Sequence, residues 1–213
     1  MIKESMLLSI NRFAKSIVQV FLTILIARLL TLTEMGLYQQ IFLIAVMVGA
    51  FIPFEMHTTF SYFFNKTDNE REKSLVITNT FWVLFILGVL MIFGLYTLYN
   101  IEFLLKDSPL RKYEIWIGFW SFATIMGCYL ENLFVSIKRA KIYSFINLSY
   151  YFAYFLIIGY TLYATKELLL TIKLIALFEI IRVIILHLSF HKIYGMSLKG
   201  DLPLLKQQLK YTA

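Results

Sequence analysis

The chain has 213 residues, of which 60% are hydrophobic and 15% are charged, and its net charge at pH 7 is +7. Its mean hydropathy of +0.74 is far above that of a soluble domain, so composition excludes a soluble enzyme and predicts an all-α integral membrane protein. The single cysteine, Cys128, excludes a disulfide within the chain and a multi-thiolate metal site.

Six hydrophobic segments predict a bundle of six membrane spans within residues 1–195. Each segment has about 20 residues or more, which is the length that crosses the hydrocarbon core. The expected spans are 8–31, 37–63, 75–99, 113–137, 142–164 and 168–190. We expect Pro53 to bend the second span, because proline interrupts the hydrogen bonding of a helix.

The distribution of Lys and Arg predicts the orientation of this bundle. With a cytoplasmic N-terminus, 13 of the 20 Lys and Arg fall on the cytoplasmic side and 6 on the outer side. Both termini are therefore expected in the cytoplasm. The positive charge is then explained by topology and by contact with anionic membrane lipids, without a nucleic-acid partner.

The first span carries cations that cannot all stay outside the membrane. Only twelve residues, about 18 Å of helix, separate Lys15 from Arg28, whereas the hydrocarbon core is about 30 Å thick. Helical periodicity places a polar stripe on one face of this helix. Its members are Arg12, Lys15, Ser16, Gln19 and Thr23. Such a stripe is expected to line a cavity, although Arg12 and Lys15 could instead extend to the cytoplasmic interface.

Three further groups of charged side chains lie inside predicted spans. Glu55 and Glu131 are expected in the cytoplasmic half of spans two and four, as counter-charges of Arg12 and Lys15. Glu179 and Arg182, three residues apart in the sixth span, are expected to form a structural or gating ion pair. The three histidines share no helix face, and no catalytic or cofactor-binding motif is recognisable, so the sequence predicts no metal site, no cofactor and no enzymatic activity.

The C-terminal segment 196–213 differs from the spans. The spacing of Leu204, Leu205 and Leu209 against Lys206, Gln207, Gln208 and Lys210 predicts a short amphipathic helix on the cytoplasmic surface. Our preferred interpretation is a connector that would lead into further spans of a longer protein. A natural C-terminal surface helix is the alternative.

Three segments resemble one family of membrane transporters. These are ARLLTLTEMGLYQQ (27–40), FSYFFNKTDNEREK (60–73) and SIKRAKIYSFIN (136–147). In residue type, order and spacing they are similar to polysaccharide-transporter flippases of the multidrug/oligosaccharidyl-lipid/polysaccharide exporter superfamily. The chain departs from many members at Ser61 and Tyr62, where a basic residue is common.

The resemblance implies a fold and a function. The fold would be the N-terminal lobe of a MATE-like transporter, in which two bundles related by an axis along the membrane normal enclose a cavity. The function would be the flipping of polyprenyl-pyrophosphate-linked O-antigen or capsule repeat units across the bacterial cytoplasmic membrane. Arg12 and Lys15, with Gln19 and Thr23, would then bind substrate. The chain would then be one of the two bundles of the transporter, and a missing second half or another copy of the chain would complete it.

The sequence leaves two alternatives to a transporter open. One is a six-helix partner subunit or gene remnant that transports nothing. The other is a membrane enzyme of lipid-linked glycan assembly, which the short predicted outer loop, about 100–112, does not favour. Drug export by a superfamily relative also remains open, although the basic stripe favours an anionic cargo.

Overall fold

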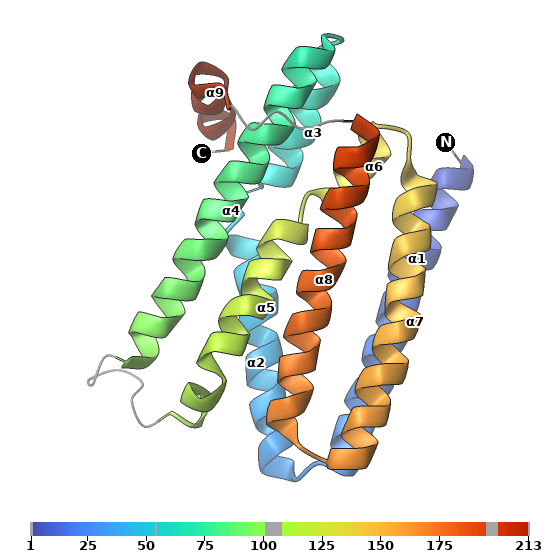
Figure 1. Cartoon of the computed structure of the whole chain (residues 1–213), viewed down its shortest axis with the longest axis vertical. Helices are drawn as coiled ribbons and strands as arrows, with labels where there is room; N and C mark the ends of the chain where they lie inside the picture. The colour runs from blue at the N-terminus through green and yellow to red at the C-terminus, as the bar shows by residue number, and fades with distance from the viewer. Residues whose placement is uncertain (1, 54, 101–107, 195–199, 213) are drawn as a thin grey trace.

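The computed structural model describes residues 2–53, 55–100, 108–194 and 200–212, and these ranges contain helices and no strands (Figure 1). The helices are α1 (Ile2–Leu29), α2 (Leu32–Phe51), α3 (Met56–Lys66), α4 (Glu70–Asn100), the short 3₁₀ helix η1 (Pro109–Tyr113), α5 (Glu114–Gly127), α6 (Leu130–Ser136), α7 (Ala140–Thr165), α8 (Leu168–Tyr194) and α9 (Leu202–Thr212).

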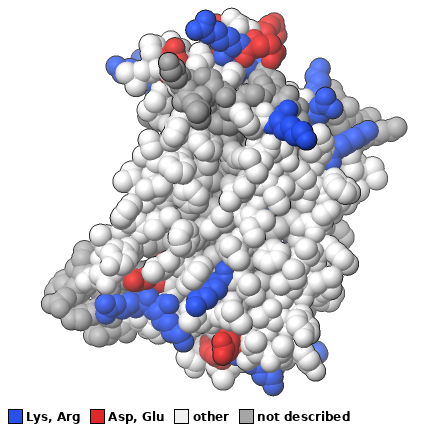
Figure 2. All heavy atoms as spheres, viewed as in Figure 1, with Lys and Arg blue, Asp and Glu red and all other residues white. Residues whose placement is uncertain are grey.

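Four helical segments of the described ranges are long and apolar enough to cross a membrane. They are Met6–Leu29, Leu32–Lys66, Glu70–Leu98 and Ala140–Thr165. Figure 2 shows the corresponding surface, an uncharged belt with the charged side chains gathered toward the two ends of the molecule. The described part of the chain is therefore all-helical, and its long apolar helices indicate a membrane protein.

The remaining two predicted spans are not among these four segments. The predicted span 113–137 is divided into α5 and α6 by Cys128 and Tyr129, so neither helix alone has the length of a span. The predicted span 168–190 lies in the long helix α8, which carries the charged pair Glu179 and Arg182.

The second predicted span is broken at Pro53, where the sequence predicts only a bend. The backbone N–H of Ile52 still donates to the Val48 carbonyl, but Met56 donates to Pro53, so a tight turn replaces continuous helix. Glu55 has a left-handed backbone with φ of 55°. Proline has no N–H to donate and clashes with the preceding turn, which explains the interruption.

Helix α2 begins five residues before the predicted start of its span, because a capping box fixes its first turn. The Thr31 hydroxyl accepts from the backbone N–H of Glu34, and the Glu34 carboxylate accepts from the backbone N–H of Thr31. Two otherwise unpaired backbone donors are thereby satisfied. The physical role of the segment TLTE within the motif 27–40 is thus to turn the chain from α1 into α2.

The helices pack as a chain of neighbours. Helix α1 packs against α7, α7 against α8, and α8 against α5, which also contacts α2 and α4. One apolar core includes Ile26 and Ile117, and a second core, toward the end where α1 begins, includes Phe134 and Phe190. Helix α9 lies at this same end (Figure 1). The predicted outer loop 100–112 falls mostly outside the described residues.

Candidate functional site

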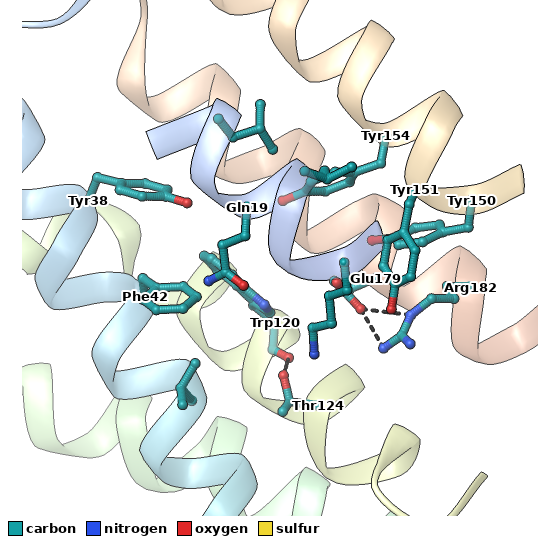
Figure 3. A pocket seen from close by; sticks show the side chains of 14 residues that line it. Gln19, Tyr38, Phe42, Trp120, Thr124, Tyr150, Tyr151, Tyr154, Glu179 and Arg182 are labelled. Atoms are coloured by element: carbon teal, nitrogen blue, oxygen red, sulfur yellow. Dashed lines mark hydrogen bonds and ion pairs between the residues drawn. The ribbon is translucent and has the colours of Figure 1, made fainter. Parts of the chain in front are cut away.

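Two adjoining cavities lie between α1, α2, α5, α7 and α8. The first, here called the polar cavity, has a volume of about 370 Å³ and is lined by Asn11, Arg12, Lys15, Gly49, Thr124, Gly127, Cys128, Glu131, Tyr143, Asn147, Tyr151 and Arg182. The second, here called the aromatic cavity, has a volume of about 130 Å³ and adds Gln19, Tyr38, Phe42, Trp120, Tyr150, Tyr154 and Glu179 (Figure 3). Lys15, Thr124, Tyr151 and Arg182 line both cavities.

The mouth of the polar cavity is held by an ion pair between α1 and α6. Arg12 Nη2 lies 2.6 Å from Glu131 Oε1. The Arg12 side chain is 73% exposed, whereas that of Glu131 is 26% exposed, so the arginine can leave the pair while the carboxylate stays in the wall. Helix α6 positions Glu131 here because the break at Cys128 and Tyr129 separates it from α5.

A second ion pair, on α8, lies in the wall of the cavities. Arg182 donates through Nε to Glu179 Oε2 at 2.9 Å, and its Nη2 lies 2.7 Å from the same oxygen. Arg182 also donates to Asn147 Oδ1 at 3.3 Å and lies over the ring of Tyr150, 5.4 Å from its centroid. Both charged side chains are largely buried, so these contacts replace the water that each would otherwise need.

Lys15 lies at the junction of the two cavities, and it differs from the two arginines. Within the described ranges it has no ion-pair partner, because Glu131 is paired with Arg12 and Glu179 with Arg182. The joined cavities therefore hold three cations and two carboxylates, with Lys15 as the surplus positive charge.

Asn11 adds an unsatisfied polar group to the same cavity. The residue is 5% exposed, and neither its side-chain nitrogen nor its side-chain oxygen has a hydrogen-bond partner in the described part of the chain. A buried amide without partners is costly, so this wall is suited to a polar ligand or to water.

The structure brings together most, but not all, of the predicted site residues. Gln19 lines the aromatic cavity. Thr23 lines neither cavity, and its hydroxyl donates to the Gln19 carbonyl of the preceding helical turn at 2.9 Å. Glu55 is exposed and also lines neither cavity. The break at Pro53 places Glu55 at the start of α3, so it does not take the predicted place beside Arg12 and Lys15.

The sequence did not predict two features of the site, which are its wall of aromatic side chains and the amides of Asn11 and Asn147. Tyr150, Tyr151 and Tyr154 lie in the middle of the predicted span 142–164, where a tyrosine cannot serve as an interfacial anchor. Their depth, together with Asn147 one turn earlier, is a sequence signal that could have identified this wall. No comparable signal marks Trp120 or Tyr38.

Comparison of the chain with protein-family models, with curated proteins and with solved structures gives no match. Among the described residues, no group of three or more His, Cys, Asp and Glu is placed to hold a metal ion.

Proposed function

We propose that this chain is one six-helix bundle of a lipid flippase, which moves a polyprenyl-pyrophosphate-linked oligosaccharide from the cytoplasmic to the outer leaflet of the bacterial cytoplasmic membrane. The observation that carries the proposal is the surplus cation Lys15 at the junction of two cavities within a membrane-spanning helix. An ionisable side chain at this depth is expensive unless it has a functional partner. A pyrophosphate supplies the missing negative charge.

The ion pair of Arg12 with Glu131 supports the same cargo. An exposed guanidinium that is held by one carboxylate through a single contact can exchange it for a phosphate, which guanidinium groups bind in a two-pronged geometry. In the empty state Glu131 neutralises Arg12, and in the loaded state the headgroup does so. A cationic drug would instead be repelled by Lys15 and would have to compete with Arg12 for Glu131.

The second proposed feature is that transport requires another bundle. Arg12, Lys15 and Ser16 are exposed on the surface of α1, and polar side chains at membrane depth must face protein or a water-filled cavity. A second bundle, either a further part of a longer protein or another copy of this chain, would cover this surface. Alternating access would come from the two bundles rocking against each other.

Proteoliposomes test this function directly. The chain is reconstituted at increasing copy number per vesicle, and the fraction of a fluorescent polyprenyl pyrophosphate that a membrane-impermeant quencher reaches is measured over time. We expect no flipping in vesicles with single copies. If another copy of this chain supplies the second bundle, vesicles with two or more copies flip the lipid, and Lys15→Gln abolishes that activity. Robust flipping by single copies would overturn the two-bundle proposal, and flipping that Lys15→Gln leaves unchanged would overturn the role of Lys15. No flipping at any copy number would show that another copy does not supply the second bundle.

A further inference from the structure

Helix α9 is attached to the bundle by specific polar contacts. Asn79 Nδ2 donates to the Asp201 carbonyl at 2.9 Å, and the Asp201 N–H donates to Asn79 Oδ1 at 2.9 Å. The Asn79 amide thus binds the backbone just before α9 at both its donor and its acceptor. Asn79 is 3% exposed, so this pair forms away from water. A helix held only by amphipathic partition into a membrane surface would not need such a contact.

The residue before Asp201 is fitted to this attachment. A Cβ at Gly200 would lie 2.7 Å from Asn79 Oδ1, which is closer than side chains approach. The Asp201 carboxylate in turn accepts from the Leu204 N–H at 2.8 Å and starts α9 as an N-cap. Gly200 and Asp201 therefore fix both the place and the direction in which α9 begins.

The far end of α9 is fastened to α3 and α4. Gln208 is completely buried, with its amide nitrogen 3.5 Å from the Thr80 hydroxyl. Tyr211 stacks on Tyr62 of α3, with ring centroids 4.5 Å apart and planes inclined by 9°. Contacts at both ends make α9 a rigid brace across α3 and α4.

Helix α3 depends on such a brace. The break at Pro53 and Glu55 interrupts the hydrogen-bonded backbone that would otherwise make α3 a rigid extension of α2. Helix α3 is held instead by packing against α4, α6 and α9. If one of these three supports is lost, the break marked by Pro53 and Glu55 can act as a hinge between α2 and α3.

We propose that α9 is a latch that fixes α3, and that releasing the contact between Asn79 and Asp201 lets α3 move relative to α2 at the break marked by Pro53 and Glu55, while α1 and α7 stay in place. The proposal concerns motion and does not depend on the cargo. It makes α9 a mechanical link between the C-terminal segment and the second predicted span.

Hydrogen–deuterium exchange of the full chain in lipid nanodiscs tests the latch. Asn79→Leu keeps the size of the side chain and removes both hydrogen bonds. We expect amide exchange to rise about tenfold in α9 and in α3, with α1 and α7 unchanged. Gly94→Ala, on the same helix as Asn79, is the control, because a Cβ there meets no atom within 4 Å.

Two outcomes would overturn the latch. Exchange that rises in α9 but not in α3 would show that α3 is held without it, and exchange unchanged in both would show that the contact contributes nothing. If Asn79→Leu raises exchange in every helix, Gly200→Ala replaces it as the test variant. Its added Cβ strains the same contact without changing a residue of α4. Faster exchange confined to α3 and α9 is again the expected result, and any other distribution contradicts the latch.

Discussion

Arg12 and Glu131, which are 119 residues apart in the chain, form a 2.6 Å ion pair that joins α1 to α6 at the mouth of the polar cavity. Helix α1 packs mainly against α7, and α6 packs against α3 and α7, so the two helices share α7 as a neighbour. The ion pair adds a direct polar contact between the stripe on α1 and the broken fourth span.

The first prediction concerns the competition between Glu131 and an anionic ligand for Arg12. Glu131→Gln removes the internal counter-charge, so we expect a several-fold higher affinity for a short-chain prenyl pyrophosphate in nanodiscs, measured by native mass spectrometry. Glu70→Gln is the control, because Glu70 is an exposed carboxylate on α4 that lines neither cavity. An unchanged or lower affinity of Glu131→Gln would exclude the competition.

The second prediction concerns the buried pair of Glu179 and Arg182. Glu179→Gln leaves the Arg182 charge without its carboxylate, so we expect a loss of about 2–4 kcal/mol in the free energy of unfolding, measured by denaturant titration in mixed micelles. Glu70 and Lys73 on α4 have the same spacing, but the Glu70 side chain is 69% exposed. We expect Glu70→Gln to cost less than about 1 kcal/mol. Equal effects at the two sites would show that burial does not strengthen the pair.

The sequence predicts these two ion pairs better than it predicts the helices that carry them. The spacing of Glu179 and Arg182 within one helix is sufficient to propose their contact, and Glu131 is one of two partners that depth suggests for Arg12. The other candidate, Glu55, does not lie beside Arg12, because the chain turns before α3. Glu55 itself has the left-handed backbone of this turn, which no hydrophobic pattern indicates. Periodicity detects long helices, but an interruption of one turn barely changes it. The break at Cys128 and Tyr129 contains no proline and leaves no strong signal.

The third prediction concerns the close approach of α2 to α5. A Cβ at Gly49 would overlap the Thr124 methyl group, so Gly49→Ala should destabilise the protein by about 1–3 kcal/mol. Thr124→Ser deletes that methyl group and keeps the hydroxyl, so the double variant should recover most of the loss. Gly36→Ala is the control, because a Cβ there meets no atom within 4 Å. Thermal unfolding of the four proteins measures the effect, and a double variant no better than Gly49→Ala would refute the contact.

The fourth prediction concerns the contact between Tyr129, in the break between α5 and α6, and His187 of α8. His187 Nδ1 lies 2.8 Å from the Val183 carbonyl and must donate to it, so Nε2, 3.0 Å from the Tyr129 hydroxyl, accepts from the tyrosine. Tyr129→Phe removes that bond, and we expect a loss of about 1 kcal/mol in unfolding free energy. Tyr160→Phe, at a position that is 74% exposed, should have no effect. Comparable losses in both variants would contradict the assignment.

The most direct test of the whole account is the binding of a short-chain prenyl pyrophosphate to Lys15→Gln in nanodiscs, compared with Arg28→Gln. Arg28 is an exposed cation on the same helix that lines neither cavity, so the two variants lose the same charge at different depths. We predict binding about 10- to 100-fold weaker for Lys15→Gln, the effect of losing a charge-assisted hydrogen bond, and unchanged binding for Arg28→Gln. Equal affinities in Lys15→Gln and the unmodified chain would contradict an anionic headgroup at this site.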